Sequence, residues 1–260
     1  MTTRRRFLTC SAAAGAVTVL PSLGLAASHG NSFALLSGRA NIHPISHASF
    51  VLETPNGVLY VDPVGEAAQY ADLPPPDQIL ITHRHGDHYN QVLLDALPAA
   101  PVLTNADVAA QLPAPMQART EVIAAGDSTM ILGLGVEAIP SYNLTEGRMN
   151  FHPKARGDIG FVLNIDGARM YVSGDTEGTP EMRALQDIDL ALVCMNLPFT
   201  MSAEQAADAV AEFSPALVIP YHYRGRDGGT QDPAEFARLL AAKGAATSVM
   251  QHDWYNGSLS

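Results

Sequence analysis

Three histidines and one aspartate fall within six consecutive positions, where the chain reads His-Arg-His-Gly-Asp-His over residues 83–88. Imidazole nitrogen and carboxylate oxygen are ligands that Zn²⁺, Mn²⁺ and Fe²⁺ accept. His83 and His85 are separated by one residue, so their side chains can point the same way and share one cation. Asp87 and His88 then face a second cation. The spacing predicts a centre for two divalent metal ions, with zinc as the first choice and manganese or iron as alternatives.

A strand must deliver this loop, and the apolar run from Gln78 to Thr82 reads as a buried strand ending at the cluster. Upstream, Ser49–Thr54 and Val58–Asp62 flank an Asn-Gly pair and predict a β-hairpin. Such hairpins, combined with strand–helix units, indicate sheets covered by helices on their outer faces. Further strands are predicted at 101–104, within 129–141, and at 160–166, 169–173, 189–195, 216–221 and 247–250, and helices at 91–97, 106–112, 203–213 and 233–243.

The cluster and three other segments resemble the metallo-β-lactamase superfamily, whose central motif is H-x-H-x-D-H. The segments His47–Thr54 and Val61–Pro63 match its opening strands, Ser173–Thr176 its Gly-Asp-Thr turn, and Ile219–His222 its last histidine. The branch it resembles contains ascorbate-6-phosphate lactonase-like and N-acylphosphatidylethanolamine phospholipase D-like proteins. The resemblance implies an α/β fold, a four-layer αββα sandwich of two mixed β-sheets with helices on the outer faces.

The resemblance also implies roles for residues outside the cluster. Asp175 would bridge the two metals, since its two oxygens can reach two cations, and His222 would be a ligand at a strand end. Asp62 is expected to accept a hydrogen bond that orients the His83–His85 loop. His47 would face the substrate or support a ligand, although an ordinary turn histidine is the alternative.

One position departs from the superfamily pattern. The superfamily usually places a histidine directly after the strand that here ends at Tyr142, and this chain has Asn143 there. The nearest histidine is His152, nine residues later. We expect His152 to supply the third ligand of the first metal, with Tyr142 and Asn143 beside the ligands or the substrate. The alternatives are that His152 donates a proton to the leaving group or only caps a loop.

The chemistry expected of such a centre is hydrolysis. Two cations about 3.5–4 Å apart hold a water and lower its pKa toward about 7. Asp87 is the predicted catalytic residue, which positions that water or accepts its proton. An ester-like bond, in a lactone or a phosphodiester, is the expected target.

Other functions remain open at this point. A β-lactam hydrolase is disfavoured by Asn143 and by the absence of a cysteine ligand, because Asp175 fills that role and Cys194 closes an apolar strand as an expected buried thiol. A non-catalytic protein that retains the metal site is a second alternative. An oxygen reductase of the flavo-diiron kind is a third, disfavoured because no flavin-binding segment follows and Arg84 stands where those proteins tend to carry a carboxylate.

Composition restricts the partners. The chain has 260 residues, of which 47% are hydrophobic and 16% charged, and its formal net charge is −11. This acidity disfavours nucleic acid, since phosphate backbones require clustered Lys and Arg. A small molecule is therefore the expected substrate. Nothing in the pattern sets an oligomeric state.

The first 27 residues predict an export signal, and residues 28–260 a single domain. Three arginines at positions 4–6 precede Phe-Leu and a weakly apolar stretch that ends in small residues. The paired arginines resemble a bacterial twin-arginine signal, which implies a periplasmic or secreted protein. The stretch is short and diluted with Gly, Ser, Thr and Pro, so no stable membrane anchor is expected.

Overall fold

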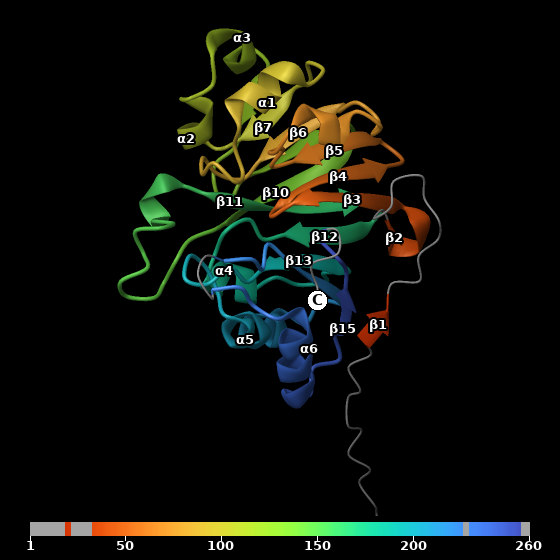
Figure 1. Ribbon diagram of the computed structural model, residues 1–260, viewed down its shortest axis with the longest axis vertical. Helices are drawn as coiled ribbons and strands as arrows, with labels where there is room; N and C mark the ends of the chain where they lie inside the picture. The colour runs from red at the N-terminus through yellow and green to blue at the C-terminus, as the bar shows by residue number, and fades with distance from the viewer. Residues whose placement is uncertain (1–18, 22–32, 226–228, 256–260) are drawn as a thin grey trace, which may run out of the picture.

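The computed structural model describes residues 19–21, 33–225 and 229–255. Two mixed β-sheets lie face to face between two groups of helices (Figure 1). The order in the first sheet is β2 (Phe33–Leu35), β3 (Ala40–Ser46), β4 (Ser49–Thr54), β5 (Gly57–Val61), β6 (Gln78–Ile81), β7 (Val102–Thr104) and β8 (Thr120–Val122). The order in the second is β1 (Val19–Pro21), β15 (Ser248–Gln251), β14 (Leu217–Tyr221), β13 (Leu190–Cys194), β12 (Ala168–Val172), β11 (Ile159–Ile165), β10 (Leu134–Pro140) and β9 (Ser128–Ile131).

Helices cover the outer face of each sheet. Near the first sheet lie α1 (Gln91–Ala96), α2 (Ala106–Ala109) and α3 (Ala114–Gln117), and on the second lie α4 (Pro180–Arg183), α5 (Ala203–Phe213) and α6 (Pro233–Ala242). Within the described residues, three short 3₁₀ helices occupy loops, at Leu36–Gly38, Ala67–Tyr70 and Lys154–Arg156. The predicted αββα sandwich is therefore confirmed.

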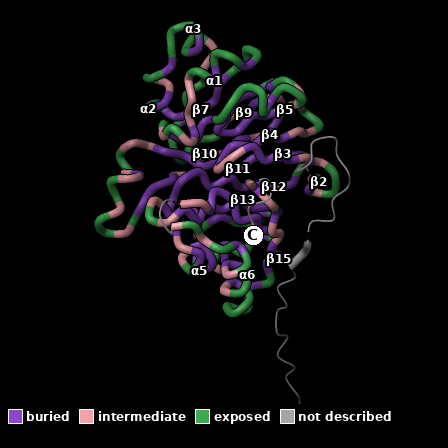
Figure 2. The backbone as a smooth tube through the Cα atoms, viewed as in Figure 1, coloured by how far each residue is buried: buried purple, intermediate pink, exposed green. Residues whose placement is uncertain are grey.

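The alternation of side chains on β4 explains why the first sheet can be buried on both faces. Phe50 and Leu52 point to the core between the two sheets, whereas Val51 packs in the cluster under α1–α3. Successive strand residues face opposite sides of a sheet, and all three of these residues are fully buried. Figure 2 shows buried strands in the centre and exposed stretches along the helices.

The longer elements follow the sequence patterns closely. The first predicted hairpin is β4 and β5, and α5 begins with a capping box in which Ser202 and Gln205 each accept a hydrogen bond from the other's backbone N–H. The helix expected over 106–112 ends at Ala109. No sequence pattern predicts β2, β3, β8, α3 or α4, because each is very short or, in β3, contains Pro44.

Strand β1 falls inside the predicted export signal. Val19–Pro21 pairs in parallel with β15 at the edge of the second sheet, while the rest of residues 1–27 lies outside the described part of the chain. Removal of residues 1–27 would take away this strand and leave β15 at the edge. None of the helices in the described residues is long and apolar enough to cross a membrane.

Candidate metal centre

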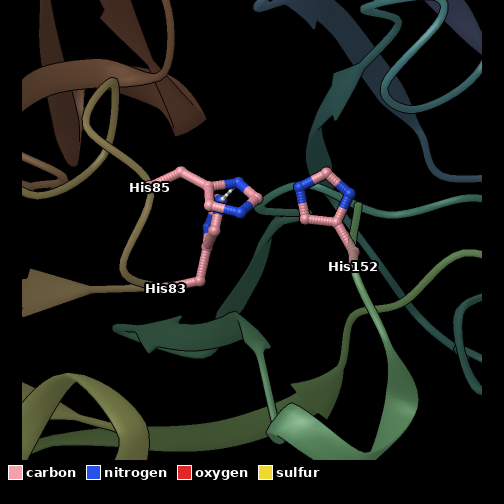
Figure 3. A group of neighbouring side chains, drawn as sticks. All are labelled: His83, His85 and His152. Atoms are coloured by element: carbon pink, nitrogen blue, oxygen red, sulfur yellow. Dashed lines mark hydrogen bonds between the residues drawn. The ribbon is translucent and has the colours of Figure 1, made fainter. Parts of the chain in front are cut away.

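The predicted ligands meet where strands of both sheets end. Residues 83–88 follow β6, His222 directly follows β14, Asp175 follows β12, and His152 comes from the loop between β10 and β11. Figure 3 shows the imidazoles of His83, His85 and His152 converging from the two halves of the molecule. Residues far apart in sequence therefore form one cluster.

The turn that carries Asp175 is fixed by close backbone packing. Gly160 on β11 lies so near this turn that a Cβ there would sit 2.5 Å from the Val172 carbonyl oxygen and 2.6 Å from that of Ser173. Only glycine allows this approach. The glycine thus lets β11 press against the segment that leads to Asp175.

The three histidines drawn in Figure 3 form a first donor group. Their candidate ligand nitrogens lie within 4.8 Å of one another. Nε2 of His83 is 3.1 Å from Nδ1 of His85. His83 and His152 are buried, whereas His85 lines the adjoining cavity.

A second donor group contains Asp87, His88 and His222, again with ligand atoms within 4.8 Å of one another. Asp175 faces both groups. Its Oδ2 is 3.3 Å from Nε2 of His152, and its Oδ1 is 3.3 Å from Nε2 of His88 and 3.4 Å from Nε2 of His222. One carboxylate therefore points an oxygen at each group.

The donor atoms fit a metal better than they fit one another. Nε2 of His88, Nε2 of His152 and Oδ1 of Asp175 are buried, and among the described residues none of them has a hydrogen-bond partner of good geometry. Each buried polar atom without a partner costs about 1–3 kcal/mol. Imidazole and carboxylate donors are the usual ligands of divalent transition metals. The residues present therefore suit metal binding.

Asp62 holds the start of the ligand loop and one imidazole. Its Oδ1 accepts from the Thr82 backbone N–H at 2.7 Å, and its Oδ2 accepts from the Thr82 hydroxyl and from Nδ1 of His88, each at 2.7 Å. With Nδ1 as the donor, the lone pair of His88 lies on Nε2, the atom that faces Asp175. Asp62, the acceptor expected from the sequence, thus orients the imidazole of His88. The imidazoles of His83 and His85 contact other residues instead.

The backbone at three site residues is left-handed, with φ of +44° at Asp62, +46° at His222 and +47° at His47. For residues other than glycine this conformation is strained and persists only where the surroundings fix it. Each residue ends or follows a strand. The strain turns these side chains sharply out of their strands and into the site.

Asn143 supports His152. Its Oδ1 lies 3.2 Å from Nδ1 of His152, and its backbone N–H donates to the His152 carbonyl oxygen at 2.9 Å. The Asn143 amide nitrogen donates to the carbonyl oxygens of Arg148 and Phe199. The asparagine therefore fixes the imidazole whose Nε2 faces Asp175.

Two further predicted residues differ in position. His47 lines the cavity, with Nδ1 3.4 Å from the Tyr255 hydroxyl and its ring 5.3 Å from that of His222. Tyr142 does not line it. Its hydroxyl donates to Glu181 at 2.8 Å and accepts from Lys154 at 3.0 Å. The buried Tyr142 side chain therefore extends away from the cavity to two residues nearer the surface.

A cavity of about 750 Å³ opens over the donor groups. Phe151, Phe199 and Val64 give it apolar walls, and Asp87, Asp175 and the imidazoles give it a polar floor. The full lining is Ser46, His47, Val64, Gly65, His85, Gly86, Asp87, Phe151, His152, Asp175, Asn196, Phe199, Arg224 and Gly225. The site can therefore admit a small molecule with both apolar and polar parts.

Sequence reasoning missed three polar residues at this site. Nη1 of Arg156 is 3.1 Å from Nε2 of His85, and the guanidinium is held by both oxygens of Asp158. Nδ2 of Asn196 is 3.3 Å from Nε2 of His222. Arg224 lines the cavity. A polar residue two positions after the buried strand β13 was the available signal for Asn196, whereas no pattern marked the two arginines.

Burial favours the neutral imidazoles of two residues of the first group, His83 and His85. Burial lowers the pKa of His85 to about 4, with His152 and Arg156 adding to the effect, and burial also holds the pKa of His83 well below its usual value. Burial alone would raise the pKa of Asp175, but His222 and His88 outweigh it and lower that pKa. Neutral imidazoles beside an ionised carboxylate are the protonation states that bind a metal.

Cys194 takes no part in these groups. The thiol is buried, 3.5 Å from the Thr176 carbonyl oxygen, and burial raises its pKa to about 12. The expectation of a buried thiol is confirmed. The Trp254 ring is also buried, where it packs against Phe50 and Tyr221.

Comparison with known proteins places this architecture in a family. The profile of the beta-lactamase superfamily domain matches residues 41–222. A UPF0173 metal-dependent hydrolase of Anaeromyxobacter dehalogenans is 31% identical over 230 residues, covering 79% of this chain and 82% of its own length. A UPF0173 metal-dependent hydrolase of Thermococcus kodakarensis is 28% identical over 211 residues, covering 76% and 91%.

Solved structures agree. A protein of Parabacteroides distasonis named as a metal-dependent hydrolase superposes with a TM-score of 0.74 at 36% identity, covering 85% of this chain and 97% of its own. The metallo-β-lactamase fold protein YhfI of Bacillus subtilis, at 12% identity, has a TM-score of 0.61 over 85% of this chain and 91% of its own and shares the fold. This chain is a metal-dependent hydrolase that belongs to the metallo-β-lactamase superfamily.

Proposed function

We propose that this hydrolase holds two divalent cations, with zinc as the first choice, and cleaves an ester-like bond in a lactone or a phosphodiester. The observation that carries the proposal is the position of Asp175, which directs Oδ2 toward the first donor group and Oδ1 toward the second. A carboxylate shared in this way suits two neighbouring cations. A single-metal site would need only one of the two groups.

His83, His85 and His152 would hold one cation, and Asp87, His88 and His222 the other, with Asp175 between them. Bound there, the cations supply Lewis acidity and a water of lowered pKa. The chain's own contribution is orientation. Asp62 and Asn143 fix the tautomer and direction of two of the imidazoles.

Asp87 is placed to handle the proton. Its side chain is 42% exposed and lines the cavity, and its Oδ2 is 3.4 Å from Nε2 of His222. Burial alone would raise the pKa of Asp87, but the hydrogen bond with His222 outweighs it and holds that pKa below its usual range. An ionised carboxylate open to the cavity can accept a proton from a water at the floor and pass it to a leaving group.

Asn196 can position the bond to be cleaved. Its side chain is buried and lines the cavity, and its Oδ1 has no hydrogen-bond partner among the described residues. Its Nδ2 lies beside His222. With Nε2 of His222 bound to a metal, the N–H groups on Nδ2 of Asn196 would be left to donate to a substrate carbonyl or phosphoryl oxygen as negative charge develops on it.

The test uses the full chain loaded with zinc or with manganese. Native mass spectrometry counts the metals, and a panel of lactone, phosphodiester, carboxyl ester and β-lactam probes reports turnover. We expect two metals per chain and turnover of a lactone or phosphodiester, with Asp87→Ala losing about 10²-fold or more in kcat. Gln111→Ala, on the exposed surface beyond α2, is the matched control.

Other outcomes would overturn the proposal. Turnover of the β-lactam alone would assign the protein to the antibiotic-hydrolysing activity. Two bound metals without turnover of any probe would favour a binding protein that retains the site. Two iron ions with oxygen-reducing activity would favour redox chemistry, and unchanged turnover in Asp87→Ala would remove the role assigned to that residue.

We also propose that the chain is exported to the periplasm or beyond. The support is the Arg-Arg-Arg-Phe-Leu segment at 4–8, followed by an apolar stretch and small residues. Fusing residues 1–40 to a folded reporter tests this. Periplasmic reporter that is lost when the arginines at 4–6 become lysines supports the proposal, whereas retention of the fusion in the cytoplasm overturns it.

A further inference from the structure

One basic side chain stands at the cavity with no acidic partner. Arg224 is the one Arg or Lys among the described residues that line the cavity. No carboxylate in the described part of the chain lies within 4.0 Å of its guanidinium. The other described arginines donate to a carboxylate or to a backbone carbonyl, as Arg156 does to Asp158 and Arg119 to Ala100. The positive charge of Arg224 is thus available to a molecule that enters the cavity.

Arg224 is held in place through Tyr255. Its guanidinium carbon lies 4.4 Å from the centre of the Tyr255 ring, and its backbone N–H donates to the Tyr255 hydroxyl at 3.4 Å. A cation over an aromatic face is attracted to it but keeps its N–H donors free at the edges of the guanidinium. The arginine is therefore positioned while its hydrogen-bonding capacity remains available.

The segment beneath Arg224 is also tightly packed. Gly225 lies so close to the loop after β13 that a Cβ on Gly225 would come within 2.3 Å of the Leu197 carbonyl oxygen. The same loop supplies Asn196 and Phe199 to the cavity. Packing thus fixes the backbone of Arg224 relative to the opposite cavity wall.

The position of Arg224 relative to the donor groups follows from a chain of rings. Tyr255 contacts His47, with ring centres 5.4 Å apart, and His47 contacts His222, with ring centres 5.3 Å apart. Arg224 itself follows His222 by two residues. The guanidinium is therefore linked to His222, a member of the second donor group, through the rings of Tyr255 and His47.

The overall charge makes this local cation important. The chain carries a formal net charge of −11, which repels anions at long range. A guanidinium recognises carboxylate or phosphate through parallel N–H donors. Phe151 and Phe199, whose rings are 5.0 Å apart, offer an apolar wall in the same cavity.

We infer that the substrate carries an oxyanion in addition to the bond that is cleaved, and that Arg224 binds this oxyanion. The oxyanion is a carboxylate or a phosphate monoester, joined to the scissile ester through a short apolar segment that lies against Phe151 and Phe199. The inference rests on the proposed ester hydrolysis at the same site. Arg224 is a specificity residue that acts on binding and takes no part in bond cleavage.

The experiment compares matched esters. Mono(4-nitrophenyl) glutarate carries a free carboxylate, its methyl ester is neutral, and 4-nitrophenyl 4-(phosphonooxy)butanoate carries a phosphate. Water adds to each ester carbonyl, the bond to the aryl oxygen breaks, and released 4-nitrophenolate is measured. The metal-loaded full chain should favour an anionic ester over the neutral one by about tenfold in kcat/KM, an effect of the size expected for a charge-assisted contact.

Variants test whether Arg224 causes this preference for anionic esters. Arg224→Met should lower the ratio of kcat/KM for the anionic and neutral esters by about tenfold, through KM rather than kcat. Arg224→Lys should retain part of it, and the exposed control Arg238→Met, on α6, should leave the ratio unchanged. Whether the carboxylate or the phosphate ester gains more identifies the oxyanion. No preference in the wild-type chain, or the same ratio in Arg224→Met, would overturn the inference.

A binding measurement separates this inference from the proposed function. Calorimetry of glutarate with the chelator-treated full chain should show weaker binding to Arg224→Met than to wild type, by about tenfold. If no ester is hydrolysed, the proposed ester hydrolysis fails while glutarate binding still decides the role of Arg224. Equal binding to both chains would count against Arg224 even if the esters are hydrolysed.

Discussion

The side-chain oxygen of Asn143 lies 3.2 Å from Nδ1 of His152, and the Asn143 backbone N–H donates to the carbonyl oxygen of the same histidine. Asn143 occupies the position that in this superfamily usually carries the histidine. The imidazole is instead supplied by His152, nine residues further along the chain, and Asn143 holds it in place. The first donor group therefore depends on a contact between side chains from two ends of one loop.

Asn143→Ala should weaken metal binding at the first donor group. Without the amide oxygen, His152 loses the partner of Nδ1, and loss of such an orienting contact typically costs about 10–100-fold in metal affinity. Competition titration with a chromogenic chelator measures the affinity. Asn164→Ala, on the exposed side of β11, is the control and should bind metal like the wild type. Equal affinities in both variants would mean that Asn143 does not orient a metal ligand.

Asp62→Asn should reduce the affinity of the metals that His88 contacts. The carboxylate accepts three hydrogen bonds, from the backbone and hydroxyl of Thr82 and from His88. An amide of the same shape keeps one acceptor oxygen but replaces the other with a donor. Metal content after dialysis against weak chelators should fall by about tenfold or more, with the far-ultraviolet circular dichroism spectrum unchanged. Full metal content would contradict the role of Asp62.

Metal removal should lower the thermal stability of the protein. Buried candidate ligand atoms of His88, His152 and Asp175 lack hydrogen-bond partners among the described residues. A metal that binds only the folded state stabilises it by about 2.7 kcal/mol when its free concentration is 100 times its dissociation constant. Calorimetric melting with and without chelator measures the change. The shift should be much smaller in Asp175→Ala, and a chelator that leaves the wild-type melting temperature unchanged would argue against a bound metal.

Ser202→Ala should destabilise the fold without affecting the site. Ser202 caps α5 through a capping box with Gln205, and loss of such a cap costs about 1 kcal/mol. Urea unfolding should show this decrease in the free energy of unfolding, with metal stoichiometry unchanged. A decrease in metal content would mean that α5 also positions the cavity.

Local pattern was sufficient for much of the molecule. The run at 83–88, Asp175 after one strand and His222 at the end of another are visible in the sequence because strand, turn and ligand adjoin in the chain. The Asn-Gly hairpin and the long helices are likewise encoded over a few neighbouring residues. Local pattern therefore predicts the run of donor residues at 83–88 and the elements around it, whereas the resemblance to the superfamily implied the αββα architecture and the ligand roles of Asp175 and His222.

Other features depend on residues that meet only when distant strands pair or the two sheets pack together. Asp62 reaches His88 across 26 positions of the chain, and Arg156 reaches His85 across 71. The support of Tyr255 beneath Arg224 joins the end of the described chain to the loop after β14. Very short strands such as β8 form because a neighbouring strand pairs with them, not because of their own pattern. The sequence thus determines which ligand residues are present. Tertiary packing determines the tautomers of the imidazoles, the residues that support them and the position of the Arg224 guanidinium at the cavity, because these properties arise from contacts between distant segments.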